Sequence, residues 1–468
     1  MRISLIGHAC LLIEVDGIRI ISDPWWSGPC FGAQWWNYPK PALEPLSERA
    51  VDFIYISHGH HDHYHPGTLK SFNRDVKLLV SANTNLGRPI RDLGFQVVEV
   101  SDEEEFRLSD NATCRIRETY AGDTFLAVSD SKEICVNLND ALHSAPHEIR
   151  EHHIASLTAL YPSIDYVFCG YGVASHFPNC YKIPGKNNRE TAAKRQQYFN
   201  KQWAKIVNDL CPRFAFPFAA DVVFLEHELF WVNEPTHNSE RPTDAFRDAY
   251  PGASTQVLDI SPGFTIRDSV IEDKILHLPF SAEEVKGTYR DSIDRANRHA
   301  EVDDRSVQAV ASLLSANLET CNAYLKSYAG DYRVLVEFYN ASQGIFIAKT
   351  KGSISARIVP SSSVDVRDHD VIYKTRLPYL KRSLTTSFGH EILFVGSGGM
   401  FEYPDASRVP DAIHREVMAM VMRHETPPTA RARPSPKLLS AAKRLAKRVL
   451  GYSEVDLYDL QTWTVFET

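Results

Sequence analysis

The 468-residue chain lacks several patterns that would place it in a structural class at once. No apolar run approaches the ~18 residues that a membrane-spanning helix needs. The eight cysteines are scattered and no two form a C-x-x-C pair, which argues against a zinc knuckle or a thioredoxin-type redox site. Basic residues are not in excess, because 51 Lys and Arg stand against 59 Asp and Glu. The resulting net charge of −8 argues against a general nucleic-acid binder.

The first residues, MRISLIGHACLLIEV, contain neither a long apolar segment nor a small-residue cleavage site. They predict a first β-strand, and we expect a cytoplasmic protein. The scattered cysteines agree with a reducing compartment, where they would act as small buried hydrophobic residues. Hydrophobic residues make up 43% of the chain and charged residues 24%, values that are ordinary for a globular protein.

The order of the patterns predicts an α/β fold. Alternating residues predict a β-hairpin around Asp16-Gly17, and the continuous apolar run VDFIYIS at 51–57 predicts a strand buried on both faces. Residues 189–210 have the pattern of an amphipathic helix. We therefore expect residues 1–265 to form two sheets sandwiched between helices.

Past residue 265 the pattern changes to two helical segments followed by short strands. Residues 266–425 are expected to form a smaller α+β domain. Residues 426–468 are expected to form a Pro-rich basic linker and a basic amphipathic helix over 437–450. That helix could dock on an anionic membrane or an acidic partner, or pack on its own domain. We expect it to be dispensable for folding of the first domain.

The segment SHGHHDHYH, directly after the buried strand at 51–57, carries the strongest chemical signal. Its pattern is H-x-H-x-D-H, with His58, His60, Asp62 and His63 in the turn behind the strand. The alternate residues His58 and His60 can coordinate one metal ion, and Asp62 and His63 can coordinate a second. Imidazoles and a carboxylate at this density suit Zn, Fe or Mn.

These residues resemble the motif of the metallo-β-lactamase-fold superfamily, which has an αββα sandwich and a dinuclear metal site. The resemblance implies a bridging carboxylate at a later strand end, and Asp140 at the end of EICVNLND matches it. It also implies a His some twenty residues earlier, where this chain has Glu118 in RETYAGDT; Glu118 is then either a ligand or an ordinary strand residue. Carboxylate-enriched sites in this fold belong to its diiron oxygen-handling branches, so the resemblance favours iron.

The last ligand that the superfamily implies is a His from a later strand end, and three positions compete for it. His227 in VVFLEHELF and His176 in GVASHFP are favoured about equally, with Asp221 as a third choice. His8, in the first turn, is a candidate for the wall of the site, or a plain buried histidine. Asp23 is expected to anchor the metal-binding loop, unless it only begins the Asp-Pro turn.

Three loops also resemble CMP-N-acetylneuraminate hydroxylases, namely SDPWWSGPCFGAQWW (22–36), GVASHFPNCY (172–181) and RFAFPFAAD (213–221). Those enzymes are iron-dependent monooxygenases that also carry a Rieske cluster bound by C-x-H and C-x-x-H pairs. This chain has no such pair, so a separate reductase or electron donor would be needed. The substrate does not carry over from the resemblance.

We therefore expect a dinuclear-metal enzyme, most simply a non-haem diiron oxygenase acting on a small polar or activated metabolite. Its candidate catalytic residues are Asp62, His8 and His176. The alternative is a zinc hydrolase that cleaves an ester, lactone or phosphodiester through a metal-activated hydroxide. A non-enzymatic metal-binding protein is a third class, which two open metal positions disfavour.

Overall fold

The computed structural model describes the chain apart from residues 103, 121, 173–174, 238–239, 274, 276–278, 327–329, 351–352, 362–368, 406–412 and 425–468. The expected linker and basic helix therefore lie outside the described residues. The chain divides into two compact units: unit 1 comprises Met1–Val173 and Arg189–Arg290, and unit 2 comprises the described parts of Ala174–Asn188 and Asp291–Val465. In the described part, no helix has the length and apolar character needed to cross a membrane.

The first sheet of unit 1 has eight strands. In spatial order they are β18 (Val270–Asp273), β17 (Thr265–Arg267), β1 (Arg2–Gly7), β2 (Cys10–Val15), β3 (Ile18–Ser22), β5 (Phe53–Tyr55), β6 (Lys77–Ser81) and β7 (Gln96–Val100). The predicted hairpin is confirmed, since β2 and β3 pair antiparallel from Val15 and Ile18 outward. Asp16 and Gly17 both have positive φ, at 47° and 78°, as a two-residue type I′ turn requires.

The second sheet has seven strands. In spatial order they are β16 (Gln256–Val257), β14 (Phe214–Phe218), β12 (Tyr166–Gly170), β11 (Ile134–Asn139), β10 (Thr124–Ser129), β9 (Thr113–Glu118) and β8 (Phe106–Arg107). The strands from β11 to β16 run parallel to one another. Their carboxyl ends therefore meet at one edge of this sheet, which is where ligands bind in open α/β sheets.

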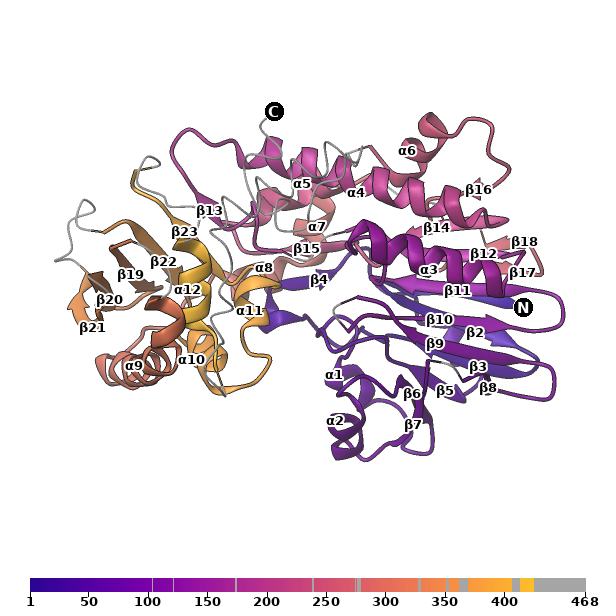
Figure 1. The fold of residues 1–468 in the computed structure, drawn as a ribbon, viewed down its shortest axis with the longest axis horizontal. Helices are drawn as coiled ribbons and strands as arrows, with labels where there is room; N and C mark the ends of the chain where they lie inside the picture. The colour runs from indigo at the N-terminus through magenta and orange to yellow at the C-terminus, as the bar shows by residue number, and fades with distance from the viewer. Residues whose placement is uncertain are drawn as a thin grey trace. The chain divides into compact units, whose positions relative to one another are not determined.

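Helices cover the outer face of each sheet, giving the four-layer αββα sandwich that the sequence predicts (Figure 1). One core lies between the sheets, with Leu5 and Tyr55 from the first against Phe168 and Phe216 from the second. The outer face of the second sheet packs on α3 (His147–Leu160), α4 (Asn188–Leu210) and α6 (Pro242–Ala249). The outer face of the first packs on α1 (Pro66–Leu69) and α2 (Gly87–Asp92).

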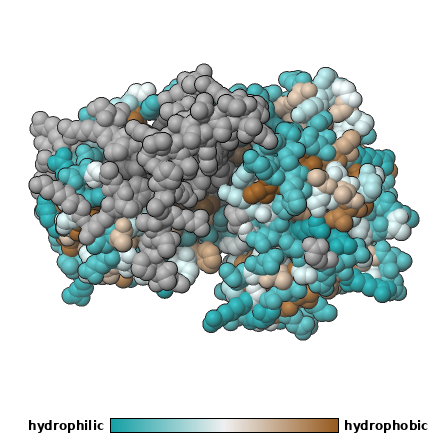
Figure 2. All heavy atoms as spheres, in the orientation of Figure 1, coloured by the Kyte–Doolittle hydropathy of each residue, from teal (hydrophilic) through white to brown (hydrophobic). Residues whose placement is uncertain are grey.

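Short elements complete unit 1. They are η1 (Phe31–Ala33), η2 (Glu44–Ser47), η3 (Phe230–Val232), α5 (Asn233–His237), α7 (Ala282–Thr288) and a two-stranded ribbon of β4 (Trp35–Asn37) and β15 (Val222–Phe224). On the face of unit 1 that Figure 2 shows, hydrophilic residues dominate and hydrophobic ones form only small patches. The buried apolar side chains of this unit form three internal cores.

Unit 2 is the smaller α+β unit. Its six-stranded sheet has the order β13 (Tyr181–Lys182), β23 (Gly399–Glu402), β22 (Val371–Thr375), β19 (Tyr332–Phe338), β20 (Gln343–Thr350) and β21 (Ser353–Pro360). Its helices are α8 (Arg290–Ala296), α9 (Asp304–Lys326), α10 (Leu377–Thr385), α11 (Glu391–Phe394) and α12 (Ile413–Val421).

The division between the units differs from the sequence expectation in two ways. The expected boundary at 265/266 falls at β17, which pairs antiparallel with β1 and so belongs to the first sheet. Unit 1 consequently continues to Arg290. In addition, the short segment that contains β13 leaves unit 1 and joins the sheet of unit 2 beside β23. A strand that pairs across more than two hundred residues leaves no local signal in the sequence.

Candidate metal centre

The H-x-H-x-D-H segment begins where β5 ends, and a buried carboxylate ties it to the sheet. Asp23 directly follows β3, the neighbour of β5, and accepts hydrogen bonds from the backbone N of Ser57 (2.8 Å) and from Ser57 Oγ (2.7 Å). Asp23 has no exposed surface. The expectation that Asp23 anchors this loop is confirmed.

The same anchor orients two imidazole rings. His63 Nδ1 lies 2.9 Å from Asp23 Oδ2, and His58 Nδ1 lies 2.9 Å from Ser57 Oγ. With Nδ1 engaged in both rings, Nε2 is the nitrogen that faces the site. A metal-binding histidine commonly has this arrangement, in which a carboxylate or hydroxyl on the other ring nitrogen fixes the tautomer.

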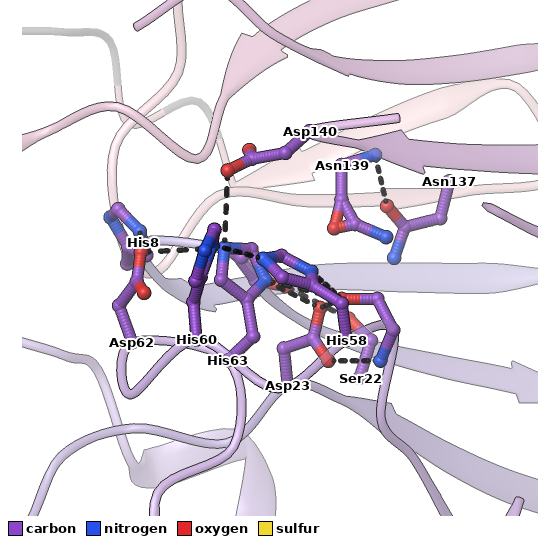
Figure 3. A network of polar contacts seen from close by, with 12 residues as sticks. His8, Ser22, Asp23, His58, His60, Asp62, His63, Asn137, Asn139 and Asp140 are labelled. Carbon is purple, nitrogen blue, oxygen red and sulfur yellow. Dashed lines mark hydrogen bonds and ion pairs between the residues drawn. The ribbon is translucent and has the colours of Figure 1, made fainter. Parts of the chain in front are cut away.

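The predicted residues come together in two overlapping groups (Figure 3). One group is His58, His63 and Asp140, and the other is His8, Asp62 and His63; within each, one ligand atom per residue lies within 4.8 Å of the others. His60 is adjacent, with Nδ1 2.8 Å from His58 Nε2. His8 Nε2 lies 3.1 Å from Asp62 Oδ2, within the second of these groups.

The donor atoms of these groups fit metal ions. Among the described residues, Asp62 Oδ1 and Asp140 Oδ1 are buried and have no hydrogen-bond partner, and His63 Nε2 lies 3.4 Å from the other oxygen of each carboxylate. Buried polar atoms are nearly always paired, so carboxylate oxygens without partners beside imidazole nitrogens fit a bound cation. Imidazole nitrogen and carboxylate oxygen together suit divalent Zn, Fe or Mn. The residues therefore fit the divalent metals that the sequence predicts, without choosing among them.

Asp123 is a further carboxylate at this site, and it is absent from the ligands predicted from the sequence. It lies in the turn between β9 and β10, with its Oδ1 3.8 Å from His58 Nε2. Burial raises the pKa of the Asp123 carboxyl to about 8, and the nearby Asp140 adds to the rise. By contrast, although burial acts to raise the pKa of Asp62, the facing His63 holds it well below its usual range. Asp123 is thus a largely buried acid, and positive charge nearby favours its ionised form.

Glu118, the residue expected as a ligand, is not in either group. It is half-buried at the end of β9, and its backbone N donates to Asp102 Oδ1 at 3.2 Å. The chain continues past it through a turn in which Thr119 N donates to Asp123 O (2.8 Å). This turn, and not the strand end, places a carboxylate beside His58.

The structure does not bring the expected last ligands to the groups either. His227 is exposed in the turn after β15, and neither group contains it. Asp221 accepts a hydrogen bond from Tyr171 Oη at 2.7 Å. His176 belongs to unit 2, where its ring packs among Tyr181, Phe394 and Phe401 at centroid distances of 5.7, 5.3 and 5.9 Å. That packing gives His176 a place in the core of unit 2.

The backbone near the site is held in an unusual conformation. His8, Asp23 and Asn139 each have φ of 40°, in the left-handed region that residues other than glycine seldom adopt. His8 and Asp23 directly follow β1 and β3, and Asn139 is the last residue of β11 before Asp140. Strained backbone of this kind gathers at functional sites, where the surrounding structure maintains it.

Comparison with known proteins agrees with this geometry. Residues 2–124 match the family model described as a beta-lactamase superfamily domain. This segment contains the whole H-x-H-x-D-H motif and both residues of the Asp123–His58 contact. The mixed α/β sandwich with metallo-β-lactamase topology expected from the sequence is confirmed.

Curated relatives extend further along the chain. A putative Rieske 2Fe-2S iron-sulfur protein of Mycobacterium tuberculosis is 24% identical over 339 residues, covering 67% of this chain and 62% of that protein. The cytidine monophosphate-N-acetylneuraminic acid hydroxylase of Danio rerio is 35% identical over 96 residues, covering 19% of this chain and 15% of the hydroxylase. This chain thus spans less than two thirds of the length of the first relatives it matches.

One solved structure is similar to part of the chain. The isothiocyanate hydrolase from Delia radicum gut bacteria is 14% identical, with a TM-score of 0.40, and the alignment covers 57% of this chain and 99% of that one.

Proposed function

We propose that this chain is a dinuclear-metal oxygenase whose centre binds iron. The observation that carries the proposal is that three carboxylates, Asp62, Asp123 and Asp140, lie beside the histidines of the H-x-H-x-D-H segment. Glu118 was expected to supply the extra negative charge, and Asp123 supplies it instead. The physical argument for iron therefore stands on a different residue.

The argument concerns charge. Three carboxylates carry three negative charges against four positive charges from two divalent ions and six from two trivalent ones. Because Coulomb attraction grows with the charge of the ion, each carboxylate stabilises the oxidised pair more than the reduced pair. Such ligands stabilise the oxidised state of a redox-active metal. Zinc keeps one oxidation state, so the same ligands only weaken it as a Lewis acid.

The names of the relatives support the same interpretation. One set is described as Rieske 2Fe-2S proteins, a class that transfers electrons, and the other as hydroxylases. The 468-residue sequence contains no C-x-H pair, so we propose that a separate module delivers the electrons. The proposed substrate is a small polar or activated metabolite.

In this proposal, the chain's own residues bind the metal ions and orient the metal-binding side chains. His58, His60, Asp62, His63, Asp123 and Asp140 would hold the two ions, and the ions would supply oxygen activation. Asp23 and Ser57 hold the rings of His63 and His58 in register. His8, bonded to Asp62, would form part of the substrate-facing wall.

Metal analysis with Mössbauer spectroscopy of protein from iron-supplemented cells tests the proposal. We expect two irons per chain, a coupled diiron signal, and O₂ uptake when the reduced protein is mixed with oxygenated buffer. Stoichiometric zinc, an iron-loaded form inert to O₂, and hydrolysis of a lactone, ester or phosphodiester panel by the zinc form would instead establish the hydrolase.

A further inference from the structure

His143 is a buried histidine outside both the predicted ligands and the two groups described above. It lies three residues after Asp140, in the turn between β11 and α3, and is only 5% exposed. Its ring packs edge-on against Phe199 of α4, with centroids 5.9 Å apart and an interplanar angle of 70°. The helix layer thus fixes the plane of the imidazole.

Gly170 shows where the ring points. A Cβ atom at Gly170 would lie 3.1 Å from Asp140 Oδ1 and 3.2 Å from His143 Nδ1. Both atoms therefore border the same small space above the bare backbone at the end of β12. The carboxylate of Asp140 and the ring of His63 are among the charged groups that act on His143, so the ring lies beside the centre.

The hydrogen bonding of His143 is incomplete at one nitrogen, Nδ1. The backbone carbonyls of Gly172 and of Asp140 both act on the ring as hydrogen-bond acceptors. Nδ1 is buried and, within the described part of the chain, has no hydrogen-bond partner, and the same is true of Asp140 Oδ1. Most buried polar side-chain atoms have at least one hydrogen-bond partner. A ring with one nitrogen on a backbone carbonyl and the other open towards a carboxylate has the usual arrangement of a metal ligand.

We propose that His143 is a metal ligand, and that its Nδ1 completes the coordination of an ion held by Asp140. His143 takes the place for which the sequence offered His227 and His176. This inference rests on the proposed metal centre and deepens it, because it adds a D-x-x-H pair within a single turn to ligands that otherwise come from separate strand ends. The ligand it recognises is a divalent transition metal ion.

Cobalt(II) titration of the full-length metal-free protein tests the inference. We compare the wild type with His143→Ala and with His152→Ala, a control on the exposed face of α3. We expect two Co²⁺ per chain for the wild type and the control. For His143→Ala we expect one site to weaken at least ~10-fold in chelator competition, with a changed visible Co²⁺ band. Added imidazole should restore the band, because it can enter the space that the side chain leaves.

The outcomes separate this inference from the proposed function. If His143→Ala binds two Co²⁺ with wild-type affinity and spectrum, the inference is overturned while the metal centre stands. If the wild type and His152→Ala bind no Co²⁺, the metal centre falls and the inference with it. Should His143→Ala fail to fold by circular dichroism, His143→Gln preserves most of the side-chain volume and carries the same expectations.

Discussion

His63 and Asp23 form a fully buried pair, in which ring nitrogen Nδ1 lies 2.9 Å from a carboxylate oxygen and neither side chain has exposed surface. Asp23 also accepts two hydrogen bonds from Ser57, so one carboxylate joins the end of β3, the start of the metal-binding loop and a proposed metal ligand. The orientation of His63 Nε2 therefore depends on a residue forty positions earlier in the chain.

Replacing Asp23 tests this dependence. We expect Asp23→Asn to weaken metal binding ~10–100-fold, since the amide has no charge with which to orient and polarise His63. Chelator competition measures the change, with exposed Asp75→Asn as the control. Equal metal affinity in the two variants would show that Asp23 only holds the loop in place and does not affect metal binding through His63.

The two carboxylates near the β9–β10 turn make a matched pair. We expect Asp123→Asn to lose at least ~10-fold in metal affinity, because Asp123 faces His58, and Glu118→Gln to stay within about twofold of the wild type. Metal content after dialysis against a weak chelator measures both. The opposite ranking would restore Glu118 as the ligand and remove Asp123.

Gly170 is expected to tolerate no side chain. A Cβ there would lie 2.6 Å from the backbone O of Asn139 as well as close to Asp140, so Gly170→Ala must displace the end of β11. We expect a loss of about 1–3 kcal/mol in the free energy of unfolding, measured by urea denaturation, together with reduced metal content. Gly252→Ala is the control, since nothing lies within 4 Å of its Cβ position. Matching stability of the two variants would contradict this close approach.

Unit 2 contains a buried ion pair with a pH-dependent effect. Lys349 Nζ lies 3.2 Å from Glu416 Oε2, and the two side chains are 2% and 3% exposed. Burial raises the pKa of Glu416 above its usual 4.5, and Lys349 opposes the rise. The folded state then holds the Glu416 proton more tightly than the unfolded state. The contribution of Glu416 to stability is most favourable below pH 4.5 and falls as pH rises through the folded pKa.

Removing the lysine should enlarge this effect. We expect Lys349→Met to destabilise unit 2 by about 3–5 kcal/mol at pH 7, because an ionised carboxylate is left buried. At pH 5 the loss should be smaller, since Glu416 can remain protonated. Thermal unfolding at the two pH values measures this, with exposed Lys381→Met as the control. A loss of the same size at both pH values would refute the explanation.

The sequence predicted those parts of the site that are local or lie at a strand end. His58, His60, Asp62 and His63 are within six residues, so any turn after β5 brings them together. Asp140 follows a strand whose neighbours were recognisable as buried runs. The sandwich itself followed from continuous apolar strands alternating with amphipathic helices, as in α4.

The remaining assignments depended on which side chains the turns direct towards the site, and the sequence does not show this. Glu118 and Asp123 are five residues apart on either side of a turn, and alternation along β9 does not tell which carboxylate reaches His58. His227 has the right position after a strand but lies on an exposed turn. His143 follows Asp140 closely, yet only the packing of Phe199 and the bare backbone of Gly170 show that its ring borders the site.

The left-handed backbone at His8, Asp23 and Asn139 puts thermal stability and metal binding in conflict. Glycine adopts such φ values at little cost, so selection for heat resistance alone would favour it there. At Asn139, glycine would also remove the amide that donates to the backbone O of Thr124, at the turn that carries Asp123. Directed evolution towards a higher melting temperature is therefore expected to yield variants that are more stable but bind metal more weakly.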